Sequence, residues 1–173
     1  MPTSKATDVL QIDYVTEDPR WKIKGLKPKT RKAVQATLQQ LGYFQSLRQC
    51  SLTILLTGDN KLKELNKGFR NKNQPTNVLS FPGYSLQEGN FSPILESGEK
   101  FPYIGDVAVS YDCVYIESGG QAKDFMNHYL HLIIHSVLHL LGYDHIKPKQ
   151  AKKMENIEII VLSHLGIGNP YEI

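Results

Sequence analysis

The chain has 173 residues, of which 40% are hydrophobic and 21% charged, as expected for one soluble globular domain that buries a core. Residues 1–20 hold no basic segment followed by an apolar one, and no apolar run approaches membrane-span length. We therefore expect no signal peptide, no membrane partner and a cytoplasmic location. The two cysteines show no CxxC spacing, which argues against a disulfide framework, and the net charge of +3 is only weak evidence for an anionic partner.

Short apolar runs predict strands, and longer segments bounded by proline or glycine predict helices. In chain order we expect strand 8–16, helix 28–41, strand 51–58, helix 60–69, strand 77–82, a strand beginning at 106, a helix from about 122 to 141 and a helix from about 148 to 165. Asn60 is the expected cap of its helix, and residues 83–104 are expected to form a long surface loop. Because strands and helices mix without strict alternation, the predicted fold is α+β: a single domain with a small mixed sheet of about four strands packed with helices.

Four of the six histidines share one stripe of the helix predicted over 122–141. His128, His131, His135 and His139 are separated by three, four and four residues, a spacing that aligns them along one helical face. A core helix has little use for that many imidazoles. Hydrogen-bonded core or surface histidines would explain any single one of them, but the grouping favours a metal site.

The chain turns after this helix in a way that brings a further histidine back to the stripe. Gly142 can adopt the left-handed conformation that reverses the chain, after which His145 can face His135 and His139. Two ligands one turn apart on a helix and a third from the following loop build a tripodal zinc site. Three imidazoles leave the fourth tetrahedral position for water, which is the catalytic arrangement. We therefore expect one zinc ion per chain.

Three further residues are candidates to support the ligand imidazoles. Asp144 precedes the third ligand and is either a general base or a hydrogen-bond partner of an imidazole, and we favour the second role. Asp106, in GDVAVS, is either a structural cap or a residue that orients a histidine. His131 is either such a partner or a packed side chain, whereas His128 and His164 are expected to be ordinary surface residues.

The same spacing occurs in the HExxHxxGxxH motif of metzincin proteases. In that motif the glutamate after the first histidine is the general base, but here Ser136 occupies the position. A serine hydroxyl cannot take that role. The histidines therefore match a protease's metal cage, and the residue needed for peptide cleavage is missing.

An arginine lies in a basic turn ahead of the strand predicted at 77–82. The segment LNKGFRNKNQPTNVLSFP carries Arg70, whose guanidinium can grip phosphate oxygens in a bidentate way. A phosphodiester substrate would use such a group, and a peptide substrate would not. Taken alone, the segment is equally consistent with an exposed loop arginine.

Four segments resemble the YbeY family of bacterial metal-dependent endoribonucleases, also called ribosomal RNA maturation factors. They are LNKGFRNKNQPTNVLSFP (65–82), GDVAVS (105–110), HSVLHLLGYDH (135–145) and LGIGNPY (165–171). The resemblance implies that His135, His139 and His145 are the zinc ligands and that Arg70 is functionally important. One departure is Ser136, where the family usually has glycine.

The resemblance also implies what the protein does. It predicts that residues 1–173 form a single YbeY-like metal-dependent hydrolase domain that processes the 3′ end of 16S ribosomal RNA and acts in ribosome quality control. Its partners would be ribosomal RNA and the small ribosomal subunit, with no DNA expected. The residues themselves leave open whether water or the 2′-hydroxyl of the RNA is the nucleophile. Two alternatives also stay open, a non-catalytic ribosome-assembly factor with structural zinc and a metzincin-like peptidase.

Overall fold

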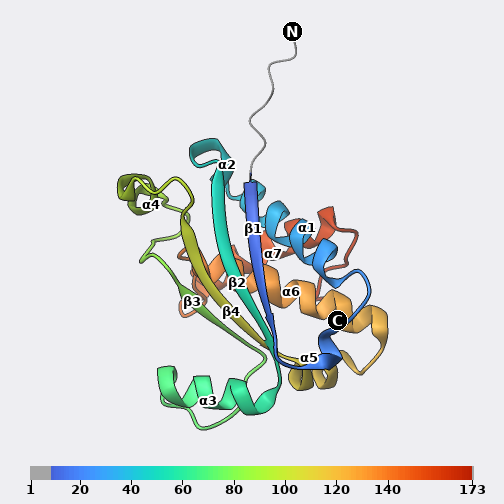
Figure 1. Ribbon diagram of the computed structural model, residues 1–173. Helices are drawn as coiled ribbons and strands as arrows, with labels where there is room; N and C mark the ends of the chain where they lie inside the picture. The colour runs from blue at the N-terminus through green and yellow to red at the C-terminus, as the bar shows by residue number, and fades with distance from the viewer. Residues whose placement is uncertain (1–8, 173) are drawn as a thin grey trace.

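The computed structural model describes residues 9–172, which form a four-stranded mixed sheet with helices packed against it (Figure 1). The strands are β1 (Val9–Thr16), β2 (Gln49–Thr57), β3 (Val78–Pro82) and β4 (Tyr103–Ser110), in the spatial order β1-β2-β4-β3. The first three strands in that order are parallel, and β3 pairs antiparallel with β4 at the edge of the sheet. This arrangement confirms the predicted α+β class and the mixed sheet of four strands.

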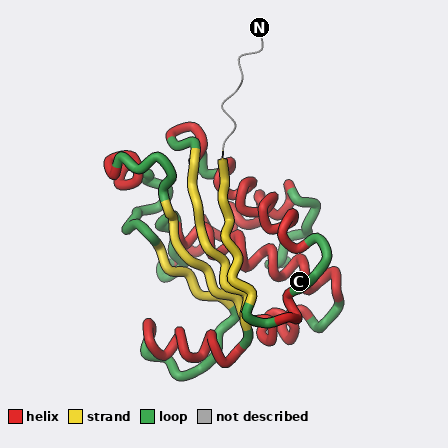
Figure 2. The backbone as a smooth tube through the Cα atoms, in the orientation of Figure 1, coloured by secondary structure: helices red, strands yellow, loops and turns green. Residues whose placement is uncertain are grey.

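Most of the helices gather on one side of the sheet (Figure 2). The helices are a 3-10 turn (Pro19–Trp21), α1 (Leu26–Gln40), α2 (Tyr43–Ser46), α3 (Asp59–Arg70), α4 (Ser92–Ser97), α5 (Tyr111–Ser118), α6 (Ala122–Leu140) and α7 (Pro148–His164). Helix α3 packs on the opposite face, where Leu62 forms a small cluster with Leu79 and Ala108. No helix within residues 9–172 is long and apolar enough to cross a membrane.

Helix α6 is the central helix of the core. It packs against α1, α5, α7, β3 and β4, and its residues Ile133, Ile134, Val137 and Leu138 are fully buried. Burying one such aliphatic side chain contributes about 1.5–3 kcal/mol. The half-buried histidine stripe therefore lies on a helix that is held rigidly by its other sides.

Two predicted helices begin earlier than expected, and the first expected strand begins one residue before the described range. The strand expected at 8–16 is β1 from Val9 onward, and residue 8 lies outside the described residues. Helix α1 starts at Leu26 because Gly25, with φ +81°, turns the chain into the helix ahead of Pro28.

The predicted Asn60 cap is wrong. Helix α3 begins at Asp59, with Gly58 at the N-cap position and Asn60 already in the first turn. The backbone N–H of Asp59 donates instead to the carboxylate of Asp112, at 2.9 Å. A carboxylate 53 residues away thus accepts the hydrogen bond from a free N–H group at the start of α3. The local sequence had pointed to Asn60 for this role.

The segment 83–104 is more ordered than the predicted surface loop. It contains the short helix α4, and its last residues already belong to β4. Phe91 and Ile94 are buried in the main core. The backbone N–H of Gly89 donates to the carbonyl of Leu141 at 3.1 Å, so this segment is fastened to the end of α6.

Candidate metal centre

The turn after α6 has the form that the sequence predicted. The N–H of Gly142 donates to the carbonyl of His139 at 3.1 Å and the N–H of Tyr143 to that of Leu138 at 3.0 Å, the two bonds of a Schellman motif. Gly142 has φ +94°, and a Cβ there would lie 2.6 Å from the carbonyl oxygen of Leu86. Both the left-handed backbone and the close approach of the 83–104 segment therefore require glycine.

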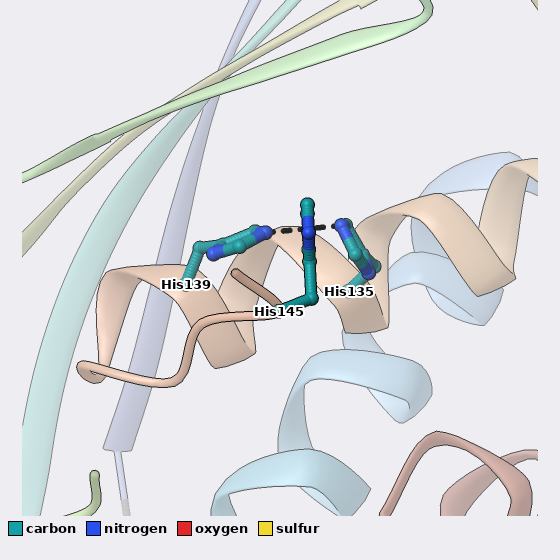
Figure 3. Close-up of side chains that lie close together, drawn as sticks. All are labelled: His135, His139 and His145. Carbon is teal, nitrogen blue, oxygen red and sulfur yellow. Dashed lines mark hydrogen bonds between the residues drawn. The ribbon is translucent and has the colours of Figure 1, made fainter. Parts of the chain in front are cut away.

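This turn brings three imidazoles together (Figure 3). His135 and His139 lie one turn apart on α6, and His145 comes from the loop between α6 and α7. One ring nitrogen from each residue lies within 4.8 Å of the others, and the Nε2 atoms of His135 and His139 are 3.0 Å apart. The predicted gathering of these side chains on a helix and its following loop is confirmed, and the group can hold a metal ion.

The hydrogen bonds at Nδ1 of His135 and His139 select the tautomer that a metal needs, with Nε2 free to bind it. The Nδ1–H of His135 donates to Oε1 of Glu158 at 2.8 Å, and the Nδ1–H of His139 donates to the carbonyl of Tyr143 at 3.0 Å. With Nδ1–H as the donor, the neutral form of each ring carries its lone pair on Nε2.

The Nε2 atoms of His135 and His139 are 3.0 Å apart, close enough for both to bind the same cation. Burial, aided by the neighbouring His135 and His145, lowers the pKa of His139 to about 4, so this ring is neutral near pH 7. A neutral imidazole with a free, pre-oriented Nε2 is what a borderline-soft divalent ion such as zinc binds. The donor set thus fits a metal.

Glu158 is the residue of this site that sequence reasoning missed. Its side chain is fully buried, and it accepts hydrogen bonds from His135 at 2.8 Å, from His131 at 3.2 Å and from the hydroxyl of Tyr171 at 2.7 Å. Burial raises the pKa of this carboxyl, but the three hydrogen bonds outweigh that effect and lower it to about 2. Glu158 is therefore an ionised carboxylate that fixes the ring of His135.

A signal for Glu158 was present in the sequence. In the helix predicted at 148–165 it follows Met154 by four residues and precedes Val161 and Leu162 by three and four. That spacing places a carboxylate on the apolar face of an amphipathic helix, where an acidic residue needs a partner. The histidine stripe on the neighbouring predicted helix offered one.

Of the three residues predicted to support the imidazoles, the structure brings only His131 into the hydrogen-bond network of the histidine rings. His131 lies beside the shared carboxylate of Glu158. Asp144 accepts from the backbone N–H of His145 at 2.7 Å, so it holds the loop rather than a ring. Asp106 hydrogen-bonds to Tyr103 and lines the α3 side of the sheet, away from α6. The structure therefore does not bring Asp106 to the histidines.

Arg70 is the last residue of α3, on the face of the sheet opposite α6. Among residues 9–172, no hydrogen bond or ion pair links its exposed side chain to the three histidines. Its proposed role in phosphate binding stays a prediction. The connection between the two faces is the edge strand β3, which contacts both α3 and α6.

Ser136 lies where α6 packs against β3. It is fully buried, its Oγ has no hydrogen-bond partner, and its carbonyl accepts from the hydroxyl of Ser80 at 3.4 Å. The side chain is directed into packing, which suits a small residue and leaves no catalytic contact for the hydroxyl.

We expect Ser136→Ala to leave zinc content and RNA cleavage nearly unchanged, because removing an unpaired buried hydroxyl costs no hydrogen bond. Ser136→Gly should lower the free energy of unfolding by up to about 1 kcal/mol through helix propensity alone. Steady-state cleavage assays and elemental analysis test this. A large activity loss in Ser136→Ala at unchanged zinc content and melting temperature would place the hydroxyl in the mechanism.

Fold and site together define the class of protein: a small α+β domain with a partly exposed three-histidine centre, the layout of a metal-dependent hydrolase. The family model for endoribonuclease YbeY matches residues 11–166. The endoribonuclease YbeY of Ruegeria pomeroyi is 38% identical over 167 residues, covering 94% of this chain and 98% of that protein. The chain therefore belongs to the YbeY family and is a hydrolase that acts on RNA phosphodiester bonds.

One solved structure also aligns with most of the chain. The solution structure of TM1509 from Thermotoga maritima aligns with 94% of this chain and 100% of its own length, at 20% identity and a TM-score of 0.49. Family membership itself rests on the sequence matches. Membership of this family favours RNA hydrolysis over the two alternatives, a peptidase and a non-catalytic assembly factor.

Proposed function

We propose that residues 1–173 form a single YbeY-like domain acting as a zinc-dependent, single-strand endoribonuclease that matures the 3′ end of 16S ribosomal RNA in the cytoplasm and serves ribosome quality control. The observation that best supports a metal site is the pair of imidazoles of His135 and His139, whose Nε2 atoms lie 3.0 Å apart. The ribosomal partner and the cleavage position rest on the family resemblance of the four motifs.

The chain's own residues account for several parts of such a reaction. Glu158 and the carbonyl of Tyr143 lock the two helical imidazoles, and the exposed His145 marks the side open to solvent. Beside His139 lies a hollow of about 330 Å³ that includes Gly142 and residues 82–86, of a size that admits part of a nucleotide. Zinc, when bound, supplies a Lewis acid and lowers the pKa of water toward ~7.

Two nucleophiles remain open, and the reaction products distinguish them. Attack by the 2′-hydroxyl of the RNA leaves a 2′,3′-cyclic phosphate, whereas attack by water does not. Purified protein would be incubated with a labelled precursor of the 16S 3′ region, free or within small subunits, and the product ends mapped. Cleavage at the mature 3′ end supports the proposal. Cleavage of unrelated single strands with no preference for this precursor would contradict the ribosomal assignment.

We expect Arg70→Ala to retain zinc content and melting temperature, because the Arg70 side chain is exposed and forms no hydrogen bond or ion pair within residues 9–172. The variant should lose most RNA cleavage, because it lacks the guanidinium that would hold the phosphate. Arg70→Lys should recover only part of the activity, since a lysine cannot form the bidentate phosphate contact. The measurement is kcat/KM on a labelled single-stranded RNA.

The matched control for Arg70 is Arg48→Ala. Arg48 is also an exposed arginine, but it precedes β2, whereas α3 follows the other end of that nine-residue strand. This control variant should cleave like the parent. Equal activity in Arg70→Ala and Arg48→Ala would remove Arg70 from the mechanism.

A further inference from the structure

The face of the sheet that α3 covers only in part carries an apolar hollow, here called the α3-face hollow. It has a volume of about 420 Å³, and its lining includes Val15, Leu55, Leu65, Phe69 and Phe81. Val15 is 49% exposed and Phe69 is 70% exposed. A phenylalanine this exposed beside a concave apolar surface contributes little to the core and is typical of a binding site.

Phe69 is held in a defined position despite its exposure. Its ring packs edge to face against Phe81 with centroids 5.0 Å apart, and Phe81 itself is half-buried against the cluster of Leu62, Leu79 and Ala108. One side of the Phe69 ring is thus supported, and most of its surface is open to solvent. A flat, supported and solvent-exposed ring is the platform on which proteins stack unpaired bases.

The charges on α3 and on the sheet beside the α3-face hollow differ in sign. Four exposed cations lie on α3 and on the residues after it, namely Lys63, Lys67, Arg70 and Lys72, and the exposed acid of this helix, Glu64, lies in its first half. On the sheet side, Asp106 lines the hollow. An anionic backbone is therefore favoured beside the end of α3 and disfavoured over the sheet. A nucleotide that fits both charges has its phosphate at Arg70 and its base directed into the hollow.

The α3-face hollow and the metal centre share the edge strand β3. Leu79 and Phe81 face α3, whereas the hydroxyl of Ser80 reaches the carbonyl of Ser136 on α6. The outer edge of β3 pairs with no strand in the described chain. A single-stranded RNA that crosses this edge of the sheet can place one nucleotide on each face of the sheet.

We propose that the α3-face hollow is a subsite for an unpaired base of the RNA substrate, which stacks on Phe69 while its phosphate contacts Arg70. The inference rests on the proposed function, because it takes single-stranded RNA as the substrate. The exposed cations on α3, the helix that carries Phe69, favour RNA over an apolar protein segment, which would leave Lys67 and Arg70 without partners. The subsite gives the enzyme a reason to prefer unpaired strands, since a base within a duplex cannot stack on a protein ring.

The test is a binding titration of the zinc-loaded protein with fluorescein-labelled 2′-O-methyl RNA ten nucleotides long, together with versions that lack one base at a time. In the parent, one abasic position should weaken binding about tenfold, the size of one base–aromatic stack. Phe69→Leu, which keeps apolar bulk but loses the ring, should weaken binding by a similar factor and become insensitive to that abasic position. Phe69→Trp should retain affinity.

Tyr115→Leu is the matched control, because Tyr115 is an aromatic residue 49% exposed on α5, outside the α3-face hollow. It should bind like the parent. Unchanged RNA affinity in Phe69→Leu, or an abasic penalty that persists in that variant, would overturn the inference and leave an apolar protein segment as the occupant of the hollow. Zinc-dependent cleavage of a long unstructured RNA by the parent reports on the proposed function separately, since that activity can stand when the subsite fails.

Discussion

Replacement of His139 by alanine is expected to abolish stable zinc binding and, with it, RNA cleavage. The residue supplies one of three convergent nitrogens, and its ring is pre-set by the carbonyl of Tyr143. Loss of one of three protein ligands should lower zinc affinity by about 100-fold or more, since structural and catalytic sites divide a large binding free energy among few ligands. Elemental analysis of the purified variant and a labelled-RNA cleavage assay measure both effects.

The control for this substitution is His164→Ala. His164 is an exposed histidine at the end of α7, outside the three-histidine group. It should keep full zinc content and activity, and both variants should stay folded by circular dichroism. A His139→Ala protein that still purified with one equivalent of zinc would show that the three-histidine group is not where the zinc is held.

Replacement of Glu158 by glutamine should weaken both the fold and the metal centre. The carboxylate accepts from His131, His135 and Tyr171 inside the protein, and an amide presents an NH₂ group toward at least one of these donors. A buried charged hydrogen-bond network that loses its acceptor typically costs about 3 kcal/mol. Zinc affinity should fall by about 10- to 100-fold, because the ring of His135 loses its orienting partner.

Urea unfolding of the zinc-free protein and zinc titration against a chromophoric chelator measure these two effects separately. Glu155→Gln is the control, since it removes the same charge one turn earlier on α7 from a residue that is only half-buried. It should behave like the parent in both assays. Parent-like stability and zinc affinity in Glu158→Gln would show that the hydrogen bonds to this carboxylate are incidental.

The same carboxylate predicts a pH dependence of stability. Its pKa falls from 4.5 to about 2 on folding, so the unfolded chain binds the proton more readily. The stabilisation is fully present above about pH 4.5 and is lost as the pH falls toward 2. Zinc-free Glu158→Gln should therefore show a flatter stability profile than the zinc-free parent across this acid range.

The three-histidine group was predictable because its determinants are local. Helical periodicity aligns His135 with His139, and one glycine with φ +94° returns the chain to place His145 beside them. Both effects act within eleven residues of sequence. The mixed sheet was predictable for a similar reason, since each strand is a short apolar or alternating run.

The features that the sequence did not reveal depend on distant contacts. The Asp112 carboxylate that caps α3 lies 53 residues from its partner, and the link between Glu158 and His135 spans 23 residues. Which elements pack against each face of the sheet cannot be read from the strand sequence, so the sequence does not show whether a strand side chain faces the histidines. Asp106 was for this reason a candidate to orient a histidine, although its side chain faces the opposite side of the sheet.

We propose that RNA cleavage depends on one zinc ion held by the three histidines. The most direct measurement is to remove the metal with a chelator, restore zinc in known amounts, and record single-stranded RNA cleavage against bound zinc. We expect no cleavage by the metal-free protein and a linear rise that saturates at one zinc per chain. Full cleavage by protein verified to be metal-free would contradict the account.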